Sequence, residues 1–232
     1  MRRTVLAIGG AAALGAAGSA SAAFVGAYFD SYAVNVGGAN YAVIDAYAQF
    51  NSTADTVLSI FNTSISNVGG AAFHHNDFNT FSGQPGSWAV TACGNIPALG
   101  LVPTNDSFVL IGGPTSSTNT TSLDPSFTPA TAAVPPNNAG WFNSSPPNLQ
   151  GRVDPTTLRT FIGRFVKAGT STAASLSFAF NMGFNQGAGT GNQFAYNNGA
   201  GRGPDFVVAY VPAPGALALL GLAGFAARRR RD

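Results

Sequence analysis

The chain has 232 residues, of which 45% are hydrophobic and only 9% are charged, with 29 Gly, 14 Pro, one Cys and no Glu. Roughly a quarter of the residues are charged in an average domain, and long helices rely on Glu, Lys and Arg pairs, so this composition excludes a helical bundle. A single Cys excludes an intramolecular disulfide and a zinc site built from cysteines. The length suits one domain with its own hydrophobic core.

The N-terminal segment has the layout of an export signal. Arg2 and Arg3 precede an uncharged run from Val5 to Ala17, and Ala20 and Ala22 provide the small side chains that a signal peptidase accepts. The run is too short to span a bilayer stably. We therefore predict a signal peptide over residues 1–22, cleaved after Ala22, with the Sec and twin-arginine export routes both left open.

The C-terminal segment consists of three parts in series, Pro212-Ala213-Pro214, an uncharged stretch at 215–227 and a basic cluster. The prolines stop a preceding strand. The 13-residue stretch makes a helix of about 20 Å, shorter than the ~30 Å hydrocarbon core, which favours a temporary stay in the membrane. Its large apolar residues are Leu217, Leu219, Leu220, Leu222 and Phe225, and the arginines that stay on the cytoplasmic side are Arg228, Arg229, Arg230 and Arg231.

This three-part layout resembles the PEP-CTERM sorting tail of exported bacterial proteins. The resemblance covers residues 212–232 and implies that an exosortase, a membrane enzyme with its own cysteine nucleophile, recognises and removes the tail. It also implies a route through the inner membrane to the cell surface or an extracellular matrix. Ala213 stands where the family usually has Glu. A plain C-terminal membrane anchor remains the alternative.

Without both ends, the charge of the chain changes sign. The segment 23–211 has five basic residues against eight aspartates, a net charge of −3, although the whole chain carries +2. The basic residues of the whole chain therefore belong mainly to targeting, and no basic patch remains for a phosphate backbone. We expect no nucleic-acid partner.

The segment 23–211 has the two-residue period of β-strands. The clearest strand places five large apolar side chains on one face: Leu176, Phe178, Phe180, Met182 and Phe184. Further strands are expected at 41–50, 56–61, 88–91, 107–111, 158–166 and 206–211, although 55–61 also fits a helical turn and 158–166 has partly helical spacing. We predict an all-β fold, one antiparallel β-sandwich or jelly-roll-like domain.

Two stretches are predicted to be long polar loops, at about 112–157 and 185–204. In the first, 18 of the 27 residues from Pro114 to Gly140 are Ser, Thr, Asn or Pro. So long a connection is either functional or loosely ordered. The second has six Gly and four Asn in the 20 residues from Asn185 to Pro204, which suggests a wide hairpin loop.

Few residues suggest chemistry. His74-His75-Asn76-Asp77 is the only place where imidazole and carboxylate are neighbours in sequence, but adjacent residues of a strand point to opposite faces. Without a third His or any Glu, a polar loop is favoured over a metal site, and we expect neither a metal nor a cofactor. Trp141, in a loop-like segment, is the speculative ligand residue because an exposed indole can stack on a sugar ring.

The sequence therefore favours an exported, non-enzymatic surface or matrix protein whose partners are signal peptidase, an exosortase-like enzyme and exopolysaccharide. The first alternative, a carbohydrate-binding module, requires an exposed aromatic strip that includes Trp141. The second, a secreted hydrolase, requires two or three acidic or imidazole side chains to converge in one cleft. The candidates are Asp30, Asp45, Asp77, Asp106, Asp154 and the two histidines.

Overall fold

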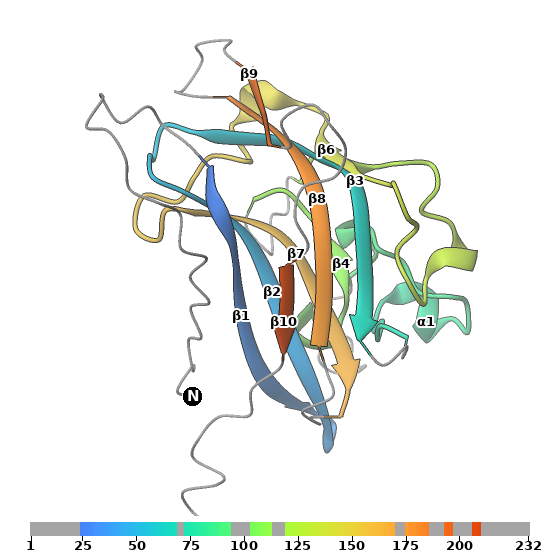
Figure 1. Ribbon diagram of the computed structural model, residues 1–232. Coiled ribbons are helices and arrows are strands. Elements are labelled where there is room, and N and C mark those ends of the chain that lie inside the picture. The colour runs from blue at the N-terminus through green and yellow to red at the C-terminus, as the bar shows by residue number, and fades with distance from the viewer. Residues whose placement is uncertain are drawn as a thin grey trace, which may run out of the picture.

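The protein is mostly β-structure, with antiparallel strands in two sheets and almost no helix (Figure 1). The computed structural model describes residues 24–68, 72–93, 103–112, 119–169, 175–185, 193–196 and 206–209. The proposed signal peptide with Ala20 and Ala22, and the whole tail at 212–232, lie outside these residues. In the described part of the chain, no helix is both long enough and apolar enough to cross a membrane.

The first sheet has four strands in the order β1-β2-β7-β4. Their bounds are Phe24–Val36 for β1, Ala39–Phe50 for β2, Arg159–Ala168 for β7 and Phe108–Val109 for β4. Gly37 and Gly38 join β1 to β2 in a two-residue turn, and both have positive φ angles, of 59° and 85°. Glycine suits this turn because both central residues of a tight hairpin of this kind need a left-handed conformation.

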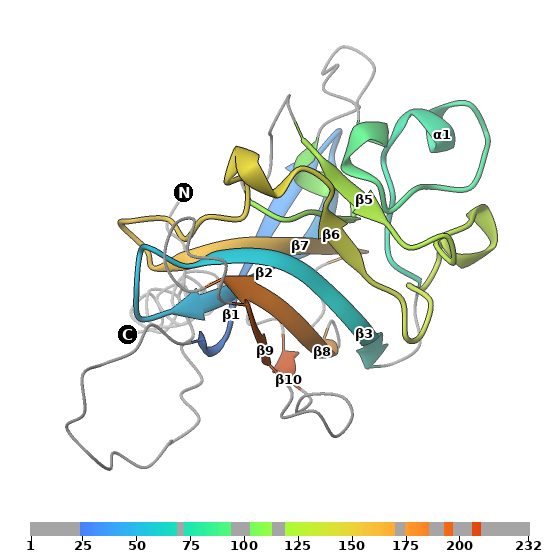
Figure 2. The ribbon, with the colours of Figure 1, turned by 90° about the horizontal axis from the view of Figure 1, so that it is seen from above.

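The second sheet has six strands, with the order β10-β8-β3-β6-β5 and with β9 paired to β8. Its strands are β3 (Thr56–Val68), β5 (Thr121–Leu123), β6 (Trp141–Asn143), β8 (Ser175–Asn185), β9 (Gln193–Tyr196) and β10 (Phe206–Ala209). The view from above shows β3 and β8 running side by side (Figure 2). They pair in antiparallel fashion from Thr56↔Asn185 to Val68↔Ser175 and form the centre of this sheet.

One hydrophobic core contains residues from both sheets. The Phe178 ring of β8 lies 6.4 Å from the Phe29 ring of β1 and 5.6 Å from the Phe165 ring of β7. The predicted apolar face of β8 is confirmed, since all five of its large side chains are at most 5% exposed. Alternation along β8 therefore determines which face enters the core.

Most of the strand predictions are confirmed, and the strand interpretation holds in both regions where a helical one was also possible. The region after Asp55 forms strand β3, not a helical turn, and the 158–166 region forms β7. The strand predicted at 88–91 is wrong, because residues Val90–Ala92 form a short 3-10 helix, and only Phe108–Val109 of the predicted 107–111 strand is extended into the sheet. Strand β1 was not predicted, although Phe24–Val36 is the longest partner of β2.

The polar stretch at 112–157 is more structured than a loop in its described part. It contains β5, β6 and short 3-10 helices at Pro129–Thr131 and Pro146–Asn148. Its backbone is fastened to β3, where Thr63 donates to the carbonyl of Ala139 and Val57 donates to that of Gly151. The other predicted loop, at 185–204, contains strand β9. Polar composition therefore did not mean absence of regular structure, because neighbouring strands supply the hydrogen bonds.

Candidate functional site

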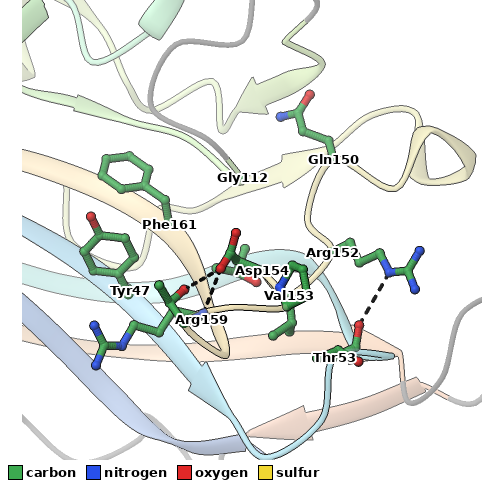
Figure 3. A pocket seen from close by; sticks show the side chains of 12 residues that line it. Tyr47, Thr53, Gly112, Gln150, Arg152, Val153, Asp154, Arg159 and Phe161 are labelled. Atoms are coloured by element: carbon green, nitrogen blue, oxygen red, sulfur yellow. Dashed lines mark hydrogen bonds between the residues drawn. The ribbon is translucent and has the colours of Figure 1, made fainter.

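A pocket of about 670 Å³ opens where β2 and β7 meet the segment 150–157 (Figure 3). Two aromatic rings, Tyr47 of β2 and Phe161 of β7, lie side by side in it, with centroids 5.5 Å apart in an edge-to-face arrangement. Gln150 and Arg152 lie on the other side of the view. The remaining lining residues are Thr53, Gly112, Val153, Asp154, Pro155, Thr157, Arg159 and Thr160.

Hydrogen bonds fix several of these polar side chains. Gln150 donates from Nε2 to the carbonyl of Ile111 at 2.6 Å, and its Oε1 accepts from the backbone of Thr120 at 2.8 Å. The Asp154 carboxylate accepts from the backbone N–H and the hydroxyl of Thr157, at 2.8 and 2.9 Å, and these bonds hold the pKa of Asp154 below its usual value. The pocket therefore contains a fixed anion and an anchored amide.

Two arginines are among the residues that line the same pocket. Arg152 donates from Nε to the carbonyl of Thr53 at 3.4 Å. The guanidinium carbon of Arg159 lies 3.2 Å from the centroid of the Tyr28 ring, a cation–π contact. Aromatic faces beside arginine and amide groups form the kind of surface that binds a polar ring or a carboxylate.

A second polar cluster is formed by side chains from two segments, the one that follows β3 and the one just before β4. His75, Asp77 and Asp106 each offer a ligand atom within 4.8 Å of the other two. Asp77 caps the short helix α1 (Phe78–Phe81), and Asp106 lies just before β4. The thiol of Cys93 donates to Oδ2 of Asp106 at 2.8 Å, and burial together with this carboxylate raises the pKa of Cys93.

Residues 74–77 lie outside any helix or strand, which agrees with the predicted polar loop, but two of their side chains take part in a buried cluster. The side chains of His75 and Asp106 are 4% and 0% exposed, so the cluster is buried. The neighbouring His74 contacts the Tyr41 ring at 4.6 Å, and burial lowers its pKa. No local pattern in the sequence joins Asp106 to this cluster, because it lies 29 residues from Asp77 and is brought there by direct hydrogen bonds, from Ser107 N–H to the His74 carbonyl and from Asn76 N–H to the Asp106 carboxylate.

The ligand role considered for Trp141 requires an exposed indole, and the structure rules it out. Its side chain is 0% exposed, and its ring stacks on that of Phe178 at 6.3 Å with an angle of 21° between the planes. Trp141 is the first residue of strand β6, where it pairs with the fully buried Ile60 of β3 and points into the core. The alternating neighbour Phe142 points outward instead and is 46% exposed.

The acidic residues named for a hydrolase do not gather in the open pocket. Asp154 is the only carboxylate in its described lining. Asp45 pairs with Arg164 inside the first sheet. Asp77 and Asp106 do converge with His75, but all three side chains are buried.

Comparison with known proteins identified no relative. No family model matches the chain, and neither a curated protein nor a solved structure matches it significantly. The functional conclusions therefore rest on the residues and geometry described above.

Proposed function

We propose that the protein is exported and acts at the cell surface or in the extracellular matrix as a structural or binding protein, not as an enzyme. The observation that carries this proposal is the pairing of an N-terminal signal layout with the three-part tail at 212–232. In this proposal, signal peptidase cuts after Ala22. An exosortase-like enzyme then recognises Pro212, Ala213 and Pro214 while the apolar helix holds the chain at the inner membrane.

We place a β-sandwich of the jelly-roll type between these two signals. Support comes from the shared core, in which Phe29 and Phe165 of one sheet contact Phe178 of the other. A domain of this kind can be stable outside the cell without disulfide bonds, because its stability derives from a large apolar interior. The sparse charge of the body, with a net value of −3, suits contacts made through polar loops.

The export proposal is tested by intact mass and by location. Cells that make the protein are fractionated into membrane, surface and medium, and the mass of each species is measured. We expect a species that begins near Ala23, ends near Pro212 and lies at the surface or outside. A variant with Arg228 to Arg231 changed to Ala should be missorted, while a control with Arg152→Ala should be sorted normally. A wild-type species that keeps its arginines in the membrane fraction would contradict the sorting proposal.

Binding of matrix polysaccharide is the second candidate function, and the pocket beside Tyr47 favours it. The pocket combines a Tyr–Phe pair with Gln150 and with two arginines, Arg152 and Arg159, against the single anion Asp154, a net positive lining that suits a sugar with a carboxylate. Its volume of about 670 Å³ lies within the range typical of ligand sites. The aromatic platform of this proposal is Tyr47, not the buried Trp141.

The second candidate is tested by pull-down with acidic and neutral polysaccharides. The doubly changed protein Tyr47→Ala/Arg152→Ala should lose binding to the acidic polymer, because it removes one ring and one cation from the pocket. Phe142→Ala is the matched control, since it removes an exposed ring outside the pocket. Equal binding by all three proteins, or none by the wild type, would exclude this pocket as a polysaccharide site.

A further inference from the structure

The buried cluster of His75, Asp77 and Asp106 contains an imbalance between donors and acceptors. Nε2 of His75 lies 2.8 Å from the carbonyl oxygen of Ala132. A carbonyl oxygen only accepts hydrogen bonds, so Nε2 carries the proton of this contact. In the neutral ring, Nδ1 is then a bare acceptor, and it faces Oδ1 of Asp106 at 3.4 Å.

Nδ1 of His75 has no hydrogen-bond partner among the described residues, although its side chain is 96% buried. A buried acceptor that faces two carboxylates is unfavourable unless a positive species lies between them. Two atoms bound to one tetrahedral ion at about 2.1 Å lie about 3.4 Å apart, which matches the distance from Nδ1 to Oδ1.

The surroundings hold each of these groups in place. Asp77 accepts from the backbone N–H groups of Thr80 and Ser87, at 2.9 and 2.6 Å. Asp106 accepts from the backbone of Asn76 and the thiol of Cys93. Every carboxylate oxygen keeps a further lone pair for an ion. Hydrogen bonds of this type, like that from His75 to Ala132, are those that orient metal ligands from outside.

The imidazole ring itself is clamped between two neighbours. The Trp88 ring meets it edge to face with centroids 4.8 Å apart. On another side the backbone of Gly86 approaches so closely that any Cβ there would collide with the His75 ring. The ring therefore cannot turn away from the carboxylates without rearrangement of the segment 86–88.

We propose that Nδ1 of His75 and the carboxylates of Asp77 and Asp106 bind one divalent transition-metal ion, with water as a further ligand. One imidazole and two carboxylates form a donor set that suits Zn²⁺. The ion would tie two segments together: residues 75–77, which lead into α1, and the segment with Asp106, just before β4. In this arrangement Cys93 is a positioning residue, which orients Asp106 through its thiol.

Zn²⁺ binding by the full chain in detergent, first stripped with a chelator, tests the proposal. Isothermal titration calorimetry should give one ion per chain, and Zn²⁺ should raise the melting temperature. His75→Gln should weaken binding by at least the 10–100-fold that loss of an outer-sphere partner causes. His74→Gln is the matched control and should keep binding, because it removes no ligand atom and no hydrogen bond to a ligand. No stoichiometric binding, or undiminished binding by His75→Gln, would overturn the site.

A second measurement observes the two histidine rings directly. The chain has two histidines, so their imidazole resonances can be assigned by nuclear magnetic resonance with His74→Gln as the reference. Zn²⁺ should shift the Nδ1 resonance of His75 and leave the His74 ring unligated. A shift at His74 alone, or at neither ring, would mean that a proton and not a metal ion separates His75 from Asp106. Substitution with Co²⁺ should give no thiolate charge-transfer band, and such a band would overturn the ligand set by making Cys93 a ligand.

Discussion

Arg164 of β7 and Asp45 of β2 face each other directly across neighbouring strands and form a bidentate ion pair inside the protein. Nε donates to Oδ1 at 2.7 Å and Nη2 donates to Oδ2 at 2.9 Å. Burial alone would lower the pKa of Arg164, but the hydrogen bonds and charge of Asp45 outweigh it and raise that pKa. Tyr32 adds a third bond to the same carboxylate, at 3.0 Å.

Removal of one partner of this pair should be strongly destabilising. We expect Arg164→Met to reduce the free energy of unfolding by about 3–5 kcal/mol, because it leaves the Asp45 carboxylate buried without its cation. The double change Arg164→Met/Asp45→Asn should recover part of this loss, since it removes the uncompensated charge. Urea denaturation of the two single variants and the double variant measures the coupling. Additive effects would contradict a coupled pair.

Phe178 should be among the most sensitive core positions. Its side chain is fully buried and its ring contacts those of Phe29, Phe165 and Trp141. We expect Phe178→Ala to cost about 3–5 kcal/mol in unfolding free energy, because the cavity joins both sheets. Phe142→Ala, on the exposed face of β6, should change stability by less than about 0.5 kcal/mol. Similar costs at the two positions would mean that the core is not organised around β8.

Gly151 should not tolerate a side chain. A Cβ at this position would meet the carbonyl oxygen of Val57 well inside contact distance, and the Gly151 carbonyl accepts from the N–H of that same residue. We expect Gly151→Ala to destabilise the protein by about 1–3 kcal/mol, because the strand contact must open. Gly26→Ala is the control, since nothing lies within 4 Å of its Cβ position. Thermal denaturation compares them, and equal melting temperatures would contradict the close approach.

Asp154 should contribute to the acid sensitivity of the protein. Its folded-state pKa is lowered from 3.8, first by the backbone N–H of Thr157 and then by the hydroxyl of that residue. The folded state then binds fewer protons than the unfolded state, so this stabilisation is complete above pH 3.8 and is lost as the pH falls through the lowered value. The wild type should therefore lose more stability than Asp154→Asn below pH 4, measured as denaturation midpoints across that range. Parallel profiles would contradict the prediction.

Local pattern determined the class of fold and the core face of its clearest strand. The alternation from Leu176 to Phe184 places one set of side chains inward whatever the neighbours are, because successive residues of a strand point to opposite faces. The low charge and the absence of Glu excluded a helical bundle for a similarly local reason. The proposal of export also rests on the sequence alone, since targeting enzymes recognise short linear segments.

Tertiary structure alone decided which distant residues meet. Trp141 lies in a polar, proline-rich stretch, yet its pairing with Ile60 directs the ring into the core. The pocket joins Tyr47 of β2 with a segment about a hundred residues later, and the polar cluster joins His75 with Asp106 through hydrogen bonds between two segments distant in sequence. Sheet register is non-local, because a shift by one residue reverses every side chain, and no short window of sequence contains the partner strand.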